Sequence, residues 1–267
     1  MDQQVFEAFC KIVYDKSGIV LNAGKEALVS VRVGKRMREL GITNHREYLD
    51  LVNNDRSGDE VAKLLDHIST NVTSFFREIA HFDFMRARLR EWRAEGQRRF
   101  RFWSAASSTG EEPYSMAMVV SEELGPGLDA RILATDISQR VLEKCKEGIY
   151  DAQKTGPVPA DLRQRYFTVR GSGSGATYQV TKDLQSLVVF KRLNLSEPPF
   201  PMKGPLDIVF CRNVMIYFDR EVRTRLVNEI YRLLRPGGFL FVGHTESLNG
   251  LATPFSSVCP AVYTKKS

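Results

Sequence analysis

The sequence predicts an α/β protein: an open sheet with helices on both faces, a small antiparallel β insert, and an N-terminal all-helical domain. Residues 1–70 show only helical periodicity. From Phe100 onward, short apolar strands alternate with amphipathic helices, as in open α/β sheets. That alternation is broken at about residues 160–186, where two strand-like segments flank a glycine-rich turn. A chain of 267 residues is long enough for two domains, which we expect at residues 1–70 and 71–267.

The helical domain is predicted from apolar residues spaced for one helix face. Such spacing occurs near the N-terminus and again over residues 25–40, and the residues that carry it are Val5, Phe6, Phe9, Ile12, Val13, Val29, Val33, Met37 and Leu40. Residues 45–52 and 60–68 predict further helices around the polar turn 53–58.

The helix over residues 25–40 also carries a basic face. Arg32, Lys35 and Arg36 have the spacing i, i+3 and i+4. Because the apolar residues occupy another face, we expect this basic face to be exposed. From the residues alone, a solvated surface and a docking surface for an acidic partner both remain open.

Residues 68–77, ISTNVTSFFR, connect the helical domain to the sheet. Asn71, Thr73 and Ser74 are residue types that favour caps and turns. Phe75 and Phe76 should anchor the segment, so that Arg77 would be presented from a fixed backbone. A helix rich in arginine is predicted next, over residues 81–96.

The central unit of the chain is a strand, a turn of small residues and a helix. Phe100, Phe102 and Trp103 predict a buried strand, and residues 105–110 are all small. Small residues let a ligand approach the backbone closely. Glu111, Glu112 and Pro113 suit the first turn of a helix that runs to Leu124. In an open α/β sheet such a unit forms the edge of a ligand crevice.

Asp136 ends the next predicted strand, residues 130–135, and Ser138 should cap the helix over 139–148. Asp136 follows Gly110 by 26 residues. An acid at this place in a Rossmann-like fold binds ribose hydroxyls. Asp136 could equally cap a helix, but the preceding small-residue loop favours the ligand interpretation.

The remaining segments complete the sheet. A hairpin is predicted from residues 166–170 and 176–181, and strands from residues 187–190, 206–210, 239–242 and 258–264. The segment CRNVMIYFD follows the strand 206–210 and ends in Asp219, which should cap a helix. We expect LRPGG, residues 234–238, to end that helix.

Composition narrows the classes of function. The four cysteines lack metal-ligand spacing and the four histidines are scattered, so we expect reduced thiols and no metal site. No apolar run approaches the roughly 18 residues of a membrane span, and the N-terminus is unlike a secretory signal. We therefore expect a cytoplasmic protein without membrane insertion. The net charge of +6 suits an acidic partner as well as nucleic acid.

The small-residue loop without GxGxxG, the later acid and the late LRPGG together resemble a class I S-adenosylmethionine (SAM) methyltransferase. The missing GxGxxG argues against an NAD-binding protein. More narrowly, the chain resembles the CheR family of chemoreceptor glutamate methyltransferases in NVTSFFRE, SAASSTGEEPYS, ATDIS, FCRNVMIYFD and LRPGGFLFVGHTES. The resemblance covers nearly the whole chain.

The resemblance implies transfer of a methyl group from SAM, without a metal, to receptor glutamates. It implies catalytic roles for Arg77, Tyr217 and Arg212. Contacts with SAM are implied for Asn71, Thr73, Arg77, Glu112, Asp136, Asn194, Leu195, Arg212 and Asn213. It also implies that the acidic helices of a chemoreceptor dock on Arg32, Lys35 and Arg36. We expect a monomer that does not bind nucleic acid.

Two alternatives remain to be weighed. A SAM-binding regulatory module without catalysis is disfavoured because Arg77, Arg212 and Tyr217 are all present. A nucleic-acid methyltransferase would be compatible with the basic composition. It is disfavoured because the Asn/Asp-Pro-Pro-aromatic signature is absent: Pro198-Pro199-Phe200 follows Glu197.

Overall fold

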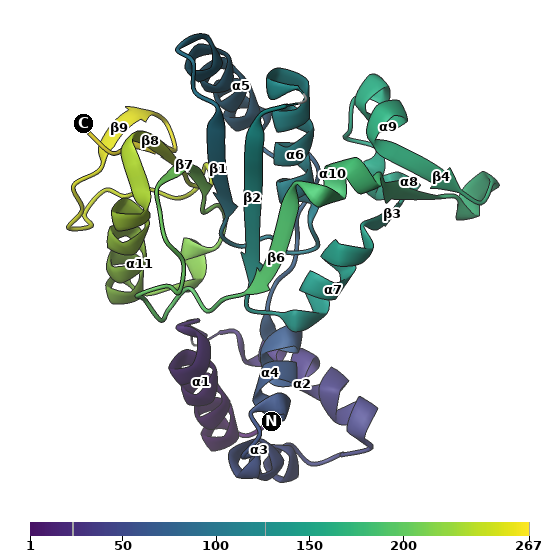
Figure 1. Ribbon diagram of the computed structural model, residues 1–267. Coiled ribbons are helices and arrows are strands. Elements are labelled where there is room, and N and C mark those ends of the chain that lie inside the picture. Colours follow the sequence, from purple (N-terminus) through teal and green to yellow (C-terminus); the bar gives the residue numbers. More distant parts are fainter. Residues whose placement is uncertain (23, 126, 267) are drawn as a thin grey trace.

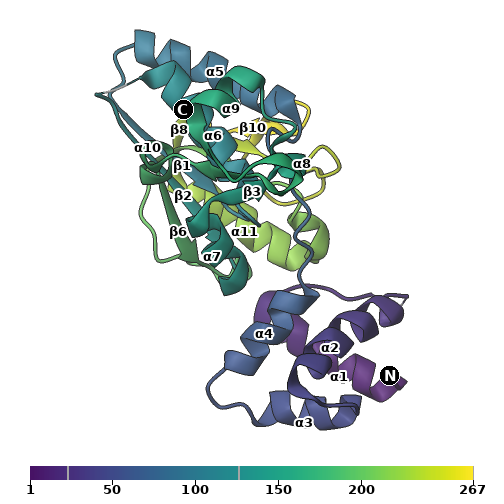
Figure 2. The same ribbon diagram turned by 90° about the vertical axis from the view of Figure 1, so that its right-hand side faces the viewer.

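A computed structural model describes residues 1–22, 24–125 and 127–266 of the protein. The N-terminal part is helical, with α1 (Gln3–Ser17), α2 (Glu26–Leu40), α3 (His45–Asn54) and α4 (Asp59–Ile68). Figure 2 shows these helices as a body joined to the rest of the chain through the segment after α4. Asp2 caps α1 by accepting from the Val5 N–H at 2.8 Å, and Asn44 caps α3.

A compact apolar core holds these helices together, and it includes the predicted residues Phe9, Val13, Val29 and Val33. Two details differ from the sequence-based expectation. The first is Leu40, which was expected on the apolar face but is 38% exposed, because it lies on the last turn of α2.

The second is the basic face of α2, which is not exposed as a whole. The Arg36 side chain is only 11% exposed and donates through Nε and Nη2 to the two carboxylate oxygens of Glu60, each at 2.8 Å. Tyr48 donates to the same carboxylate at 2.9 Å. A carboxylate buried between helices needs such partners, and it draws Arg36 inward. Lys35 remains exposed.

The second part of the chain is built on a seven-stranded sheet in the order β6-β2-β1-β7-β8-β10-β9. The strands are β1 (Arg99–Ser104), β2 (Asp129–Asp136), β6 (Val188–Arg192), β7 (Leu206–Phe210), β8 (Leu234–Phe241), β9 (Ser256–Cys259) and β10 (Val262–Thr264). The pairs from β6 through β8 are parallel, whereas β10 runs antiparallel to both β8 and β9.

Helices cover both faces of this sheet, as the sequence predicted (Figure 1). One apolar cluster joins α5 (Ile79–Ala94) and α6 (Glu111–Leu124) to one face through Phe82, Met85 and Phe102. A second cluster joins α11 (Arg220–Leu233) to side chains of the opposite face, including Trp103 and Val209. α7 (Gln139–Glu147) follows β2 and is capped by Ser138, as expected.

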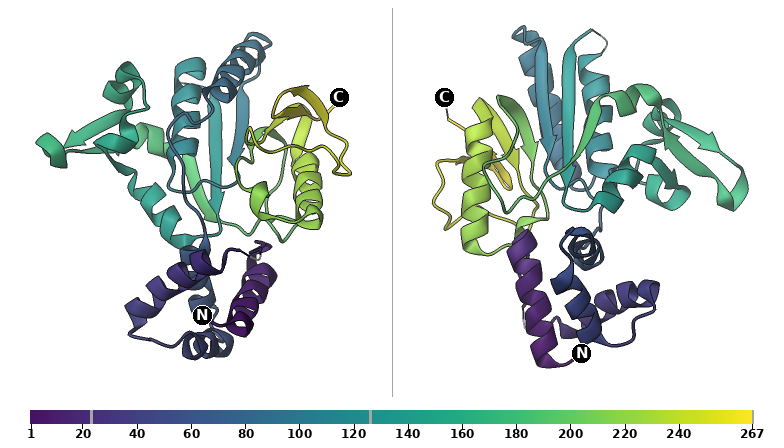
Figure 3. Two further views of the ribbon diagram at one scale, coloured as in Figure 1. Left: turned by 180° about the vertical axis from the view of Figure 1, so that it is seen from behind. Right: turned by 60° about the horizontal axis from the view of Figure 1, so that its bottom comes forward.

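A three-stranded antiparallel sheet, in the order β3-β5-β4, forms the insert. β4 (Phe167–Arg170) and β5 (Thr177–Val180) are the predicted hairpin, with the turn η1 (Gly173–Gly175) between them. β3 (Ile149–Asp151) was not predicted, because three residues are too few to show a period. α8 (Ala152–Thr155), α9 (Ala160–Tyr166) and α10 (Lys182–Ser186) complete the insert, which projects on the side away from the C-terminus (Figures 1 and 3).

α11 ends at Leu233, directly before LRPGG as expected, but two strand boundaries near the C-terminus were wrong. The residues RPGG belong to β8, which begins directly after α11, and Leu206 pairs with Leu234 while Ile208 pairs with Phe239. The extra residues form an irregularity that the proline and glycines accommodate. The single strand expected at residues 258–264 is instead the hairpin of β9 and β10, with Ala261 at φ 62° in its turn. Among the described residues, no helix combines the length and apolar character needed to cross a membrane.

Candidate functional site

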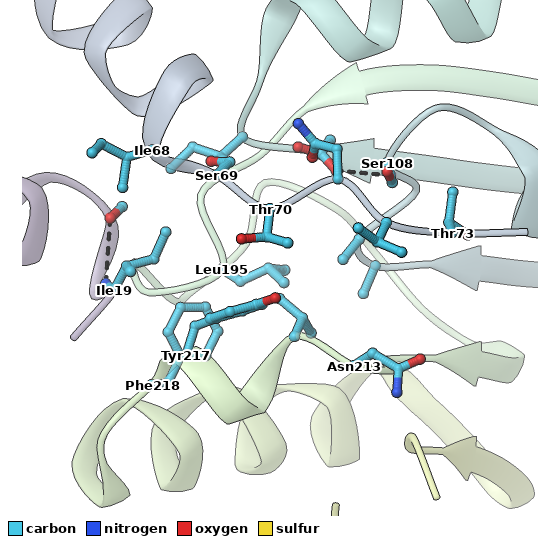
Figure 4. Close-up of a pocket in the computed structure, with 18 of the residues that line it drawn as sticks. Ile19, Ile68, Ser69, Thr70, Thr73, Ser108, Leu195, Asn213, Tyr217 and Phe218 are labelled. Atoms are coloured by element: carbon cyan, nitrogen blue, oxygen red, sulfur yellow. Dashed lines mark hydrogen bonds between the residues drawn. The ribbon is translucent and has the colours of Figure 1, made fainter. Parts of the chain in front are cut away.

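A cleft that is open to solvent lies at the carboxyl ends of β1, β2, β6 and β7. The helical part of the chain lies directly beneath these strand ends and supplies one wall (Figures 1 and 4). The strand order reverses direction at β1, which lies between β2 and β7. This is the position at which open α/β sheets bind ligands.

The small-residue loop after β1 forms the floor of the cleft. The Ser107 N–H donates to the Thr135 carbonyl at 2.8 Å, which fastens the loop to the end of β2. Gly110 has φ 98°, and a Cβ added there would lie 2.7 Å from the Tyr150 hydroxyl oxygen. Glycine is therefore required by both the backbone and the space. Ser108 lines the cleft, and its hydroxyl is buried without a hydrogen-bond partner among the described residues, which is unusual for a buried polar group.

Asp136 lies at the end of β2, nearly buried, on the wall of the cleft. Its carboxylate accepts from the Ser108 N–H at 2.9 Å and from the Ser138 N–H at 3.0 Å. Burial raises the pKa of Asp136 to about 6. The side chain that caps α7 is Ser138, so the helix-cap alternative for Asp136 is wrong. The free lone pairs of the carboxylate remain available to hydroxyl donors such as those of ribose.

Arg212 and Glu112 form a buried ion pair behind the cleft. The Arg212 side chain is 2% exposed, and its Nε lies 3.1 Å from Glu112 Oε2. Ser104 donates to the other Glu112 oxygen at 2.7 Å. Burial raises the pKa of the Glu112 carboxyl, and the Arg212 guanidinium opposes that shift. The guanidinium also lies over the rings of Phe82 and Phe210, with its Cζ 5.5 and 5.2 Å from their centroids.

Each Nη atom of Arg212 also has a hydrogen-bond partner in the protein, whereas Nε, although close to Glu112, has none among the described residues. Nη2 donates to the Arg77 carbonyl at 2.6 Å, and Nη1 donates to His81 Nδ1 at 3.1 Å. Burial and the neighbouring Arg212 charge lower the pKa of His81 to about 4, so this imidazole is neutral. Arg212 is therefore an interior residue that fixes the backbone at Arg77. The sequence did not indicate this role.

His81 and His244, far apart in the sequence, meet beside Arg212. Their ring centroids are 4.9 Å apart, and Glu78 completes a group whose ligand atoms lie within 4.8 Å of one another. The scattered histidines had led us to expect no such cluster. However, the Arg212 guanidinium lies 3.8 Å from Glu78 Oε2 and already supplies positive charge there.

Arg77 and Tyr217 approach the cleft from different elements. Phe75 and Phe76 are buried, as predicted; Phe75 packs edge-on against Tyr150 and Phe76 against Phe82. Half-buried Arg77 donates from Nη1 to the Val72 carbonyl at 3.1 Å. Tyr217 ends the short helix η2 (Met215–Tyr217) and projects into the cleft from the wall facing Thr70 and Thr73 (Figure 4).

Asn213 is held by an acid that the sequence analysis missed. Glu246, in the loop after β8, accepts from the N–H groups of Asn213 at 2.7 Å and Gly243 at 2.6 Å. Asn213 has a backbone φ of 56°. Its side chain packs on Gly243 so closely that a Cβ added to Gly243 would lie 2.3 Å from Asn213 Nδ2. The only available signal was the acid of HTES following a strand at the same sheet edge.

The helical domain lines the cleft as well, which the sequence analysis did not foresee. Its contributions are Ser17, Ile19, Leu21, Lys25, Leu28, Arg32, Ile68, Ser69 and Thr70. Several bonds hold it in place: Asn194 donates to the Lys16 carbonyl at 3.0 Å, and the Val20 N–H donates to the Tyr217 carbonyl at 2.8 Å. Lys35 and Arg36 do not line the cleft, so the three proposed partner-binding residues have separate surroundings.

The predicted cofactor and catalytic residues converge on this one cleft. They come from the linker, from the first turn of α6, from the ends of β2, β6 and β7, and from η2, and they are Asn71, Thr73, Arg77, Glu112, Asp136, Asn194, Leu195, Arg212, Asn213 and Tyr217. Residues spread over more than half of the sequence thus surround a single ligand-sized space.

Comparison with family models assigns the chain. The model described as "CheR methyltransferase, SAM binding domain" matches residues 71–263, and "CheR methyltransferase, all-alpha domain" matches residues 4–69. The chain belongs to the CheR methyltransferase family. Its sheet domain is thus a SAM-binding methyltransferase domain. The buried Ser108 hydroxyl beside Asp136, which has no partner in the described part of the chain, fits a cofactor that carries ribose hydroxyls.

Curated CheR relatives extend over most of the chain. It is 37% identical over 261 residues to the chemotaxis protein methyltransferase of Salmonella typhimurium, a match covering 97% of this chain and 88% of the relative. The chemotaxis protein methyltransferase of Escherichia coli is 38% identical, with 97% and 89% covered. Chemotaxis protein methyltransferase 2 of Pseudomonas aeruginosa is also 38% identical, with 97% and 92% covered.

Proposed function

We propose that this CheR-family methyltransferase transfers the methyl group of SAM to glutamate side chains of chemotaxis receptors, forming glutamate methyl esters. The observation that carries the proposal is the position of Arg77 at the cofactor cleft. Of the arginines that line the described part of the cleft, Arg32 and Arg212 have guanidinium groups bonded to protein partners on both Nη atoms. Arg77 uses one of its donors, on Val72, and keeps the rest for a substrate.

The reaction places modest demands on the protein. SAM, when bound, supplies a methyl group activated by a sulfonium. A glutamate with an ordinary pKa of about 4.3 is ionised at neutral pH, so no residue need act as a general base. The task of the protein is then to align the carboxylate oxygen and to exclude water.

Arg77 suits that alignment because a guanidinium can hold a carboxylate through two parallel hydrogen bonds. The Tyr217 hydroxyl, on the facing wall, would orient the reacting groups without transferring a proton. We assign Arg212 a supporting catalytic role, since its Nη2 holds the carbonyl of Arg77 at 2.6 Å. If Arg212 also contacts SAM directly, as we propose, it would do so through the N–H groups that it does not donate to Arg77 and His81.

The cofactor would be held by residues of both walls. We propose that Asp136 binds the ribose hydroxyls and that Asn194 and Leu195 lie near the adenine. Asn71, Thr73, Glu112 and Asn213 would surround the amino-acid part of SAM, and the chemistry so assigned needs no metal.

For the partner, we propose the acidic cytoplasmic helices of a chemoreceptor, docked in part on α2. Lys35 is the exposed member of the predicted basic set, whereas Arg36 is bonded to Glu60. We further propose that the protein works as a cytoplasmic monomer and does not act on nucleic acid.

The direct test uses labelled methyl groups. Purified protein, SAM labelled in the methyl group and receptor-enriched membranes should give receptor-bound label that mild base releases, as expected for an ester. Arg77→Ala should lower turnover at saturating SAM by about a hundredfold or more, and its melting temperature should stay near that of the wild type. Tyr217→Phe tests the hydroxyl in the same way.

Base-stable label would refute the glutamate ester, and label on nucleic acid instead of receptor would support the alternative substrate. Binding of S-adenosylhomocysteine (SAH), the demethylated product, without any methyl transfer would instead favour a regulatory module.

A further inference from the structure

We propose that Arg32, on helix α2, is a positioning residue for the cofactor cleft. Its guanidinium binds two residues that lie far along the chain. Nη1 donates to the Ile68 carbonyl, and Nη2 donates to Thr70 Oγ1 at 2.9 Å. Arg32, Ile68 and Thr70 all line the cleft. The inference relies on the proposed function only for the identity of the ligand.

The segment that Arg32 holds has few other restraints, one of them being the bond from Arg77 Nη1 to the Val72 carbonyl at 3.1 Å. Residues 70–74 have no regular secondary structure, and Val72 is 77% exposed. On its N-terminal side, α4 ends at Ile68, whose carbonyl is one of those left unsatisfied by the helix. On its C-terminal side, the buried Phe75 resumes the fixed structure. Arg32 therefore fixes this connection from outside.

The position of the connection matters because it carries Asn71 and Thr73, two residues proposed to contact SAM. A guanidinium suits the carbonyl of Ile68, since a cation at the C-terminal end of a helix is favoured by the helix dipole. Its second donor selects one rotamer of Thr70 and so fixes the backbone next to Asn71. Helix α2 is thereby part of the cofactor site even though it belongs to the helical domain.

The same bonds distinguish Arg32 from its neighbours on α2. Arg36 is held by Glu60, and exposed Lys35 and Arg38 do not line the cleft. Arg38→Gln is therefore a matched control, because it removes one positive charge from the same helix without touching the described linker contacts.

A positioning role for Arg32 and a purely electrostatic role predict different effects of Arg32→Gln on the affinities for SAM and SAH. SAM carries one more positive charge than SAH. If Arg32 acted only as a nearby cation, Arg32→Gln would relieve repulsion and tighten SAM relative to SAH. If it positions the linker, the affinities for SAM and SAH should fall by the same factor.

The experiment is calorimetric titration of the full chain with SAH and with SAM. Arg32→Gln should weaken binding of both by about tenfold, as for loss of a partly exposed, charge-assisted pair of hydrogen bonds. Thr70→Val should weaken both by a smaller factor, Thr70→Ser should bind like wild type because it keeps the hydroxyl acceptor, and Arg38→Gln should be unchanged.

The double variant Arg32→Gln/Thr70→Val isolates the pair. Its loss of SAH affinity should be smaller than the product of the two single losses, because both remove the same bond. Unchanged SAH affinity in Arg32→Gln, multiplicative losses in the double variant, or tightening of SAM alone would each overturn the proposal. If Arg32→Gln fails to fold, Thr70→Val against Thr70→Ser decides. Wild type that binds SAH but does not methylate receptors would refute the proposed function and leave this inference standing.

Discussion

Asp136 should make both stability and cofactor affinity depend on pH, and Asp136→Asn should remove that dependence. The buried carboxyl has a pKa raised to about 6 from an ordinary 3.8. A raised carboxyl pKa means that the folded protein binds the proton more tightly than the unfolded chain. The folded state is therefore stabilised by this group as the pH falls through 6 toward 3.8, and the full cost of the buried charge is present above pH 6.

The size of the effect follows from the shift. A difference of about two pKa units corresponds to roughly 3 kcal/mol at neutral pH, of which about 2 kcal/mol is recovered between pH 7.5 and pH 4.5. The asparagine introduced by Asp136→Asn would not titrate, but its amide would face one of the two backbone N–H groups, from Ser108 or Ser138, at a cost of roughly 1–3 kcal/mol. The difference in stability between wild type and variant at one pH is therefore less informative than the change of that difference with pH.

Urea unfolding of the wild type and Asp136→Asn from pH 7.5 to 4.5 measures that slope. The wild type should gain about 2 kcal/mol relative to the variant over this range. In parallel, SAH affinity of the wild type should fall as the pH drops below 6, and by up to tenfold at pH 5, because the protonated acid loses its charge-assisted bonds. Parallel stability curves together with flat SAH affinity would refute the raised pKa and the ribose role.

Three further outcomes are expected. Gly110→Ala should lower stability by about 1–3 kcal/mol and weaken SAH binding, since its Cβ meets the Tyr150 hydroxyl; urea unfolding and calorimetry check this, and a neutral effect would contradict the tight turn. Glu60→Gln should cost several kcal/mol, on the order of 3–5, because it leaves Arg36 without its buried partner; an unchanged urea midpoint would show that the pair contributes little. Lys35→Glu should slow receptor methylation most at low salt, where screening is weak, and leave SAH affinity unchanged; equal rates for variant and wild type across ionic strength would remove α2 from the docking surface.

Local patterns predicted most elements of the fold. α2 and α4 follow from apolar spacing, and the buried strands β1 and β7 from short apolar runs ending in turn residues. The wrong boundaries arose where the local sequence pattern differs from the structure that the segment adopts. β8 includes RPGG, residue types that are typical of a turn. These four residues fall in the irregularity between the pairs Leu206–Leu234 and Ile208–Phe239, and Gly237 and Gly238 bond instead to the backbone of Lys265.

Side-chain partners across the fold could not be predicted in the same way. Arg36 and Glu60 are 24 residues apart and lie on different helices, so nothing local shows that the basic face of α2 turns partly inward. The pairing of Arg212 with His81 spans 131 residues. The motif residues that line the cleft were identifiable by resemblance. The bond that Glu246, itself in a motif, accepts from Asn213, and the bond from Arg32 to Thr70, are revealed only by the folded chain.

The surroundings of the three arginines at the cleft differ, and the different tasks that we propose for them rest on that difference. Arg212 is neutralised by Glu112 and Glu78 within 3.8 Å, and it is buried, so bringing a substrate carboxylate to it would require displacing one of these acids. Arg32 has both Nη atoms bonded to the linker and its charge lies on the wall formed by the helical domain. Arg77 combines a backbone fixed through the Arg212 contact with a half-buried guanidinium on the cleft wall. A substrate carboxylate of the kind we propose would therefore meet Arg77 as the arginine with donors to spare, on a backbone that the Arg212 bond helps to fix, as alignment for in-line transfer requires.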